Sequence, residues 1–138
     1  MIVLDTDVFS ASMHDEPEPR LAAWLDRQSW KSLHITAVTV YEVRRGIELL
    51  APSARRRHLD QAFAHALSVG LSWRILPLDE SGAEQAAILS VQRQRAGHPG
   101  DLRDTLIAGI AISRGATIAT RNLRHFRDLP VDVVDPWG

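Results

Sequence analysis

The chain has 138 residues, of which 45% are hydrophobic and 24% are charged, and its formal net charge at pH 7 is −1. This length fits a single domain over residues 1–138 that is large enough to bury a hydrophobic core. The small net charge excludes a strong overall positive field for capturing nucleic acid, and the lack of cysteine excludes disulfides, thiolate zinc sites and cysteine nucleophiles.

The first half of the chain alternates short apolar runs with helical patterns. We predict strands at residues 1–4 and 33–37, where apolar residues run together. Apolar residues at spacings of three and four predict helices at 8–13, 21–28, from Thr39 to the stop at Pro52, and 54–69. Residues 14–19 form a polar, proline-bearing connector.

The second half continues the alternation. We predict strands at 73–76, 117–119 and 131–134, a helix from the cap at Asp79 to about residue 95, and a helix at 102–113 that is apolar on nearly all sides. Strands that alternate with helices favour a parallel sheet covered on both faces. The expected fold class is therefore α/β, a three-layer α/β/α sandwich around a short, mainly parallel sheet.

No stretch of the chain approaches the roughly 20 apolar residues that a membrane-spanning helix needs. The N-terminal apolar run meets an acid at Asp5, too early for a signal peptide. We therefore expect a cytoplasmic protein with no membrane association.

Three carboxylates lie where apolar segments begin or end, a place where a bare charge is normally avoided. Asp5 directly follows the first strand, and Glu42 and Asp104 fall in the first turns of two predicted helices. A buried carboxylate is costly unless it is hydrogen-bonded, paired or bound to a metal. Three such residues at the carboxyl-end rim of a parallel sheet suggest a shared site for a divalent cation.

Each of these acids also has a structural explanation. Thr39 and Glu42 fit a capping box, and Asp101 can cap the helix that contains Asp104. Asp7 can cap the first helix alone, which would leave Asp5 free. The spacing therefore leaves both the capping role and the metal-binding role open.

Other polar residues have weaker signals. The segment Thr120, Arg121 and Asn122 follows a predicted strand, so it can contribute to the same rim through a metal-bound water or the substrate, or can form an ordinary turn. The six histidines show no metal-ligand spacing. The four tryptophans lie in different segments and are expected to pack in the core and at interfaces.

Several short motifs resemble those of PIN-domain ribonucleases. They are Val3-Leu4-Asp5-Thr6-Asp7, Tyr41-Glu42, Asp104-Thr-Leu-Ile-Ala108, and Ala119-Thr-Arg-Asn122 continuing to Phe126. Their order and spacing, with the closing Asp135-Pro-Trp, are similar to VapC-type toxins of bacterial toxin–antitoxin modules, including the FitB-like subgroup. The resemblance covers essentially the whole chain.

This resemblance implies a fold, an activity and partners. It implies a magnesium- or manganese-dependent endoribonuclease that forms a homodimer and is inhibited by a small antitoxin that occludes the active site. The expected substrate is RNA, such as tRNA or another structured RNA. Carried over by position, Asp5, Glu42 and Asp104 become the catalytic and metal-binding acids.

The chain departs from the family pattern at three positions. Asn122 stands where many relatives carry a fourth acid, His125 where they often carry aspartate, and Asp7 where asparagine or serine is common. Because Asn122 weakens one ligand position, an alternative function is a PIN-like module that binds RNA or a partner with little turnover.

Overall fold

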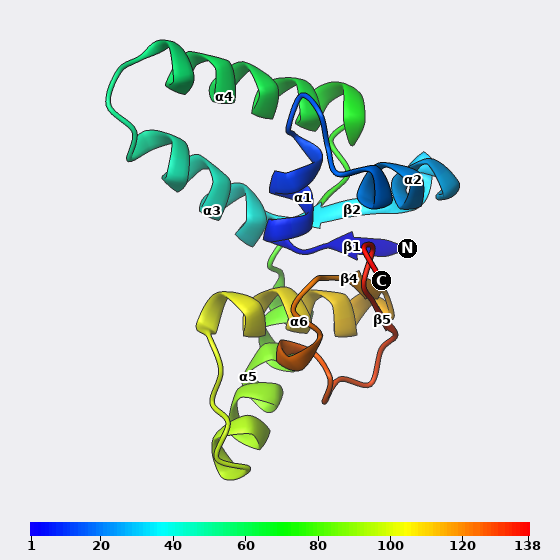
Figure 1. Cartoon of the computed structure of the whole chain (residues 1–138). Helices are drawn as coiled ribbons and strands as arrows, with labels where there is room; N and C mark the ends of the chain where they lie inside the picture. Colours follow the sequence, from blue (N-terminus) through cyan, green and yellow to red (C-terminus); the bar gives the residue numbers. More distant parts are fainter.

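A five-stranded parallel sheet forms the centre of the computed structural model, which describes residues 1–138. Figure 1 shows it edge-on between two groups of helices. The spatial order of the strands is β3-β2-β1-β4-β5. The strands are β1 (Ile2–Leu4), β2 (Leu33–Thr36), β3 (Ile75–Leu76), β4 (Thr117–Ala119) and β5 (Val133–Val134).

β1 lies in the middle of the sheet and fixes its register. Ile2 pairs with Leu33 of β2 on one side and with Thr117 of β4 on the other. The strands are short and almost entirely apolar, as expected for a parallel sheet with both faces covered.

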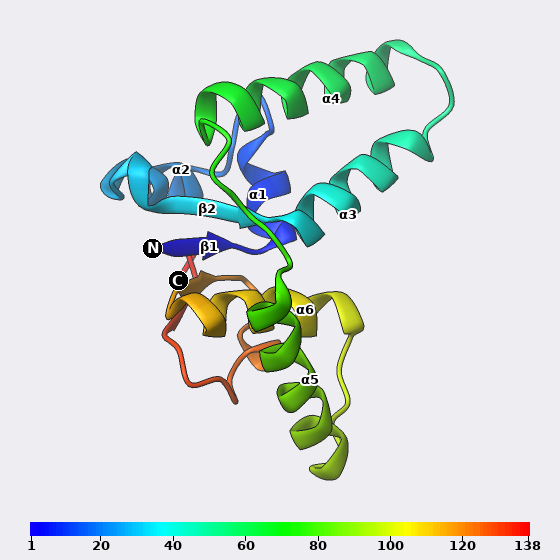
Figure 2. The ribbon, with the colours of Figure 1, turned by 180° about the vertical axis from the view of Figure 1, so that it is seen from behind.

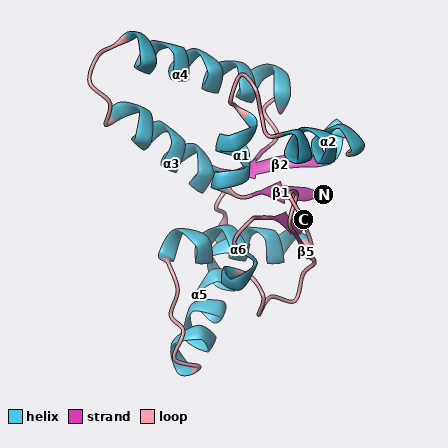
Figure 3. Ribbon diagram, in the orientation of Figure 1, coloured by secondary structure: helices cyan, strands magenta, loops and turns pink.

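Two helical layers cover the sheet, as Figures 1 and 3 show from the same side. The first layer contains α1 (Thr6–Ser12), α2 (Pro19–Arg27), α3 (Ala37–Glu48) and α4 (Ala54–His65). The second layer contains α5 (Glu80–Arg95) and α6 (Leu102–Arg114). Figure 2, from behind, shows the chain passing from the first layer to the second after α4.

The sheet separates two hydrophobic cores. Successive residues of a strand point to opposite faces, so Val3 packs among the side chains of α5 and α6 while Leu4 packs among those of α1 to α4. Phe9 and Phe63 meet edge to face in the first core, with ring centroids 6.1 Å apart. Ile107 and Ile110 are completely buried in the second core.

α5 and α6 approach each other closely at Gly109. A Cβ atom at this position would lie 2.5 Å from the carbonyl oxygen of Gly82 and 2.6 Å from the Cβ of Ala86. Small residues on both helices therefore set the spacing of the second layer.

The predicted helices and strands are all present, with shifted ends. The segment predicted as one helix at 54–69 is α4 followed by a π-helical turn, η2 (Ala66–Gly70). The predicted strand at 73–76 is shorter because Ser72 and Trp73 have positive φ angles. No helix is long and apolar enough to cross a membrane.

The tryptophans divide between the core and the surface. Trp137 is buried in the first core, as expected, whereas Trp30 and Trp73 are 56% and 64% exposed and lie outside the core. The guanidinium of Arg74 lies 4.9 Å from the centre of the Trp30 ring, so this surface tryptophan packs against a cation.

Candidate active site

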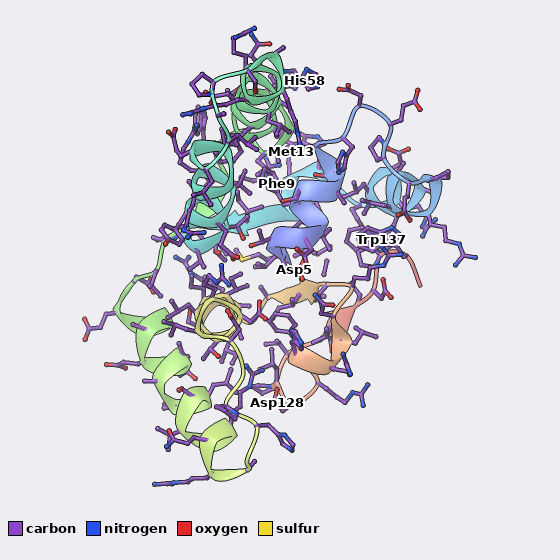
Figure 4. The ribbon with its side chains drawn as sticks, turned by 60° about the vertical axis from the view of Figure 1, so that its left-hand side comes forward. Asp5, Phe9, Met13, His58, Asp128 and Trp137 are labelled. Carbon is purple, nitrogen blue, oxygen red and sulfur yellow. The ribbon has the colours of Figure 1, made fainter.

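The site forms at the carboxyl ends of β1 and β4, where the order in which the chain adds strands to the sheet reverses. After β1 the chain crosses through the first helical layer to β2, whereas β4 is reached through the second layer on the other side of β1. Crevices form at such switch points in open α/β sheets. Asp5 and Thr120 directly follow these two strands, and Figure 4 shows Asp5 between the two layers.

Asp5 is held by hydrogen bonds to both of its carboxylate oxygens. Oδ1 accepts from the backbone N–H of Val8 at 2.9 Å, and Oδ2 accepts from the hydroxyl of Thr120. Asp5 is therefore itself the N-cap of α1, so the expectation that Asp7 caps this helix and leaves Asp5 free is wrong. The side chain of Asp7 is instead exposed in the first turn.

The carboxyl of Asp5 is only 5% exposed, and its surroundings are unfavourable for a negative charge. Its pKa is raised to about 6, chiefly by burial and also by the charges of Asp7 and Asp104, although the hydrogen bonds from Thr120 and Val8 act in the opposite direction. None of the ion pairs in the structure involves Asp5. Asp5 is thus a buried acid whose charge is uncompensated by the protein.

Asp104 reaches the same rim from the first turn of α6. Asp101 caps this helix by accepting from the backbone N–H groups of Arg103 and Asp104, as predicted. The side chain of Asp104 lies 3.0 Å from Nδ1 of His125. Burial raises the pKa of Asp104, and the contact with His125 opposes this rise.

Glu42 is positioned differently from the prediction. α3 begins at Ala37 and is capped by Thr36, so Thr39 is not the cap and Glu42 lies in the second turn. The helix starts earlier because β2 runs directly into it. The capping-box explanation of Glu42 is therefore excluded, since such a box requires the glutamate at the third helical position.

Glu42 instead faces α1 and α6. Its Oε1 accepts from the hydroxyl of Thr6 at 2.8 Å, and its Oε2 lies 3.6 Å from the guanidinium of Arg103. Because Thr6 is next to Asp5 in the chain, this bond ties Glu42 to the same rim. Arg103 is the nearest counter-charge to Glu42.

The segment after β4 contributes three residues to different parts of the rim. Thr120 is completely buried against Asp5. The side-chain amide of Asn122 donates to Asp7 at 3.2 Å. Arg121 turns away from the acids, with its guanidinium 4.5 Å from the ring centre of Trp137 and 3.8 Å from Glu18.

The sequence reasoning overlooked Thr6, Arg103 and Arg93. Arg93 is 5% exposed and binds both carboxylate oxygens of Asp128 at 2.9 Å. A signal for it exists in the sequence, because Arg93 continues the column of small and apolar residues at Gly82, Ala86 and Leu89. A charge at helical spacing on a buried face indicates a structural ion pair or a site.

The site offers only a few protein ligands to a metal ion. No group of three or more histidine, aspartate or glutamate side chains is arranged to hold a metal ion. The charge of Asp104 still acts on Asp5, and both residues offer carboxylate oxygens. Mg²⁺ prefers oxygen and commonly binds through one or two carboxylates while it keeps several waters. The donor set and the uncompensated charge of Asp5 therefore fit such a cation.

Comparison with known proteins agrees with this geometry. The PIN domain family model matches residues 2–131. The chain is 32% identical to VapC ribonuclease Y4jK of Sinorhizobium fredii, over 99% of this chain and 98% of that protein. It is also 32% identical to toxin FitB of Neisseria gonorrhoeae, over 99% of both chains.

Solved structures give the same result. The structure of FitAB bound to a DNA fragment contains a chain that superposes with a TM-score of 0.89 at 32% identity, covering 100% of this chain and 96% of that one. The crystal structure of FitAcB from Neisseria gonorrhoeae gives a TM-score of 0.88 at 32% identity, with 99% of both chains covered. The chain therefore belongs to the PIN-domain family, within the group that contains the VapC and FitB proteins.

Proposed function

We propose that this chain is the toxin of a toxin–antitoxin module and that it is an endoribonuclease that hydrolyses RNA phosphodiesters with the help of Mg²⁺ or Mn²⁺. The observation that carries this proposal is the buried, uncompensated carboxylate of Asp5 at the switch point of the sheet, next to Asp104. RNA cleavage of this kind is consistent with the ribonuclease named among its relatives.

The proposed cation site uses Asp5 and Asp104 as direct ligands and Glu42 through a water molecule. Bound there, a divalent cation would supply positive charge for the phosphate and would acidify a water molecule for attack. Thr6 and Asn122 would contact metal-bound waters or the substrate, and the buried Thr120 would hold Asp5 in place. Arg121 pairs with Glu18 and packs on Trp137, so we do not assign it to RNA binding.

The chain's own residues prepare this site by fixing the acids. The bonds from Val8 and Thr120 allow Asp5 little freedom to rotate, and the bond from Thr6 restrains Glu42. His125 restrains Asp104 from the segment after β4. Ligands restrained in this way lose little entropy on binding and keep the geometry that hydrolysis requires.

The proposed antitoxin is a small partner that covers the active site. A surface cavity of about 320 Å³ between α1, α3 and α4 leads to Glu42 and Arg103. Its walls include Met13, Val43 and Ile47, so an apolar peptide segment could pack there while a basic residue reaches the acids.

The proposed homodimer uses an apolar surface formed by α3, α6 and the segment before α5, and Arg45 and Arg103 border both this surface and the antitoxin cavity. Tyr41, Leu78 and Leu102 are 58%, 41% and 70% exposed, and they line one surface with Val38 and Leu106. Clustered exposed apolar side chains of this kind are typical of an interface between proteins.

RNA cleavage by purified protein with Mg²⁺, with Mn²⁺ and with a chelator tests the proposal. Cleavage should require the metal and should fall by at least about 100-fold in Asp5→Asn and Asp104→Asn, with a smaller loss in Glu42→Gln. The matched control is Asp26→Asn, which removes an exposed carboxylate on α2 and should cleave like the unchanged protein.

Cleavage that persists in a chelator, or in all three site variants, would contradict this assignment. The alternative is a PIN-like module that binds RNA or a partner with little turnover. It is favoured by Asn122 in place of a fourth acid and by the absence of a three-ligand cage. Metal-independent RNA binding without cleavage by the unchanged protein would support that alternative.

A further inference from the structure

A second polar cavity, of about 360 Å³, opens beside Asp104. It lies between the end of α5, the loop that leads to α6, and the segment that follows β4, which includes the short helix η3 (Leu123–His125). Figure 4 labels Asp128 in this region, on the α5 side of Asp5. Because Asp104 also belongs to the proposed metal site, the two sites are contiguous.

Arg93 holds the three walls of this cavity together. Its guanidinium binds both oxygens of Asp128, the hydroxyl of Thr105 at 3.3 Å and the backbone carbonyl of His125. Gly100 passes close over it, with a φ of +70° and its Cβ position 3.4 Å from Nη1 of Arg93. The buried side chain of Arg93 therefore fixes the shape of the cavity, which is not set by flexible surface side chains alone.

The acids that line the cavity are each matched by a nearby base. Asp128 is paired with Arg93, and Arg93 lowers the pKa of Asp128. Asp101 lies 3.4 Å from the guanidinium of Arg103. Asp104 contacts His125.

Two arginines in the same cavity have no such partner. Arg124 and Arg127 both line it, both are exposed, and neither forms an ion pair or a side-chain hydrogen bond in the structure. His98 lines the cavity beside them, also without an ion pair. Arg124 and Arg127 are therefore the arginines of this lining that remain free to bind an anion.

The opposite end of the rim has the reverse charge. A cavity of about 770 Å³ beside Asp7 and Asn122 is lined by Asp15, Glu16 and Glu18, and its one arginine, Arg121, is paired with Glu18. An RNA strand whose reacting phosphate lies at Asp5 has to continue in some direction. The acidic cavity repels its backbone, whereas the cavity of Arg124 and Arg127 attracts it.

We propose that Arg124 and Arg127 form a subsite for backbone phosphates of single-stranded RNA next to the phosphate that is hydrolysed. No phenylalanine, tyrosine or tryptophan lines the cavity, so it lacks the large aromatic side chains on which single-stranded RNA is commonly stacked, and we assign it to the backbone. Arginine presents a planar fork that matches phosphate oxygens. Arg93 is a positioning residue that fixes the segment on which both arginines lie. This inference rests on the proposed function.

The test measures the affinity of a fluorescently labelled single-stranded RNA of about 12 nucleotides, a length within the site sizes of single-strand binding proteins. Asp5→Asn protein is used so that the RNA stays intact, and the dissociation constant is followed as a function of salt. Removing one arginine that neutralises a phosphate should reduce the slope of log K against log salt by about 0.7. Adding Arg124→Gln and Arg127→Gln should therefore reduce the slope by about 1.4.

The matched control adds Arg55→Gln and Arg57→Gln instead. These two arginines are also exposed and unpaired but lie at the start of α4, so their removal subtracts the same charge without changing the slope. Equal slopes for the two double variants would overturn the subsite. So would an unchanged RNA slope combined with stabilisation by inorganic phosphate that depends on Arg124 and Arg127, because the cavity would then bind free phosphate alone.

The test of the subsite can fail independently of the test of the nuclease activity. Cleavage is measured on the unchanged protein and binding on the Asp5→Asn background. A reduced slope in a protein that never cleaves RNA would support the subsite and contradict the nuclease activity. If the substitutions at Arg124 and Arg127 leave the slope of log K against log salt unchanged while the unchanged protein cleaves RNA, the subsite is contradicted and the nuclease activity is supported.

Discussion

The two helical layers that cover the sheet differ in how tightly they pack. In the second layer, the backbone of α6 at Gly109 packs closely against Ala86 of α5. Five consecutive residues of α6, from Ile107 to Ala111, are buried. In the first layer, α4 has one buried residue, Phe63, and cavities of about 540 and 320 Å³ open beside α1. In Figure 1 the hairpin of α3 and α4 extends beyond the sheet.

This difference separates two tasks. The tight layer fixes Asp104 and, through Arg93, the segment that carries Arg124 and Arg127. The open layer carries Glu42 on α3 and leaves grooves that a partner can fill. A site built across such a boundary combines a rigid set of ligands with a surface that can adapt.

The largest effect is expected from Gly109→Ala, which tests the tight layer. The added methyl group would lie 2.6 Å from the Cβ of Ala86 and 2.5 Å from a backbone oxygen, so the two helices must separate. We expect the free energy of unfolding to fall by about 3 kcal/mol. Urea denaturation followed by circular dichroism measures this change.

Gly46→Ala in α3 is the matched control from the open layer. Apart from the backbone of its own helix and its chain neighbours, no atom lies within 4 Å of its Cβ position, so the new methyl group meets no obstacle. Alanine is the better helix former, and the free energy of unfolding should rise by up to about 1 kcal/mol. A similar response of both glycines would show that the layers do not differ in packing.

The next effect concerns Asp5, which lies between the layers. Its pKa is raised from 3.8 to about 6, so the folded protein binds a proton more tightly than the unfolded chain does, and stability falls as the pH rises from about 4 to about 6. Asp5→Asn removes this cost, so at pH 7 and without metal it should stabilise the fold by about 1–3 kcal/mol. Unfolding curves of both proteins from pH 4 to pH 8 measure the difference.

The advantage of Asp5→Asn should disappear near pH 4, where the carboxyl of the unchanged protein is protonated. Asp26→Asn, which neutralises an exposed carboxylate on α2, provides the control for a general change in charge. Equal stability of the two variants at pH 7 would mean that burial of Asp5 costs nothing. Mg²⁺ should stabilise the unchanged protein more than Asp5→Asn, and less in acid, because protons compete for the same oxygens.

The fold was predictable because local signals agreed along the chain. Apolar runs such as Ile2–Leu4 and the cap at Asp79 are local signals that locate strands and helices without any knowledge of tertiary contacts. Helix starts were less predictable. Thr36 and Thr39 are both good caps, and only the length of β2 decides which one begins α3.

The candidate site was predictable as a set of residues but not as a geometry. Adjacency of Asp5 and Thr120 follows from the strand order, which no local pattern specifies. The links from Thr6 to Glu42 and from Arg93 to the carbonyl of His125 join segments distant in sequence. Such links depend on how the layers pack, so a single sequence names the acids without showing which partners hold them.

The smallest effect expected is in hydrogen exchange, which compares the layers within one molecule. Amides of α6 around Ile110 should exchange only when the whole protein unfolds, because their side chains form the second core. In α4, the protection of the amides from exchange depends on the packing of Phe63 and on the ion pair between Arg44 and Asp60. Local opening of the helix can therefore expose these amides to solvent. We expect exchange in α4 to be at least about tenfold faster than in α6, which corresponds to about 1.4 kcal/mol in opening free energy. Mass spectrometry of peptides from the two helices measures the ratio.

A partner that fills the grooves of the first layer should slow exchange in α4 and leave exchange in α6 unchanged. Equal protection of both helices in the free chain would refute the contrast between the layers.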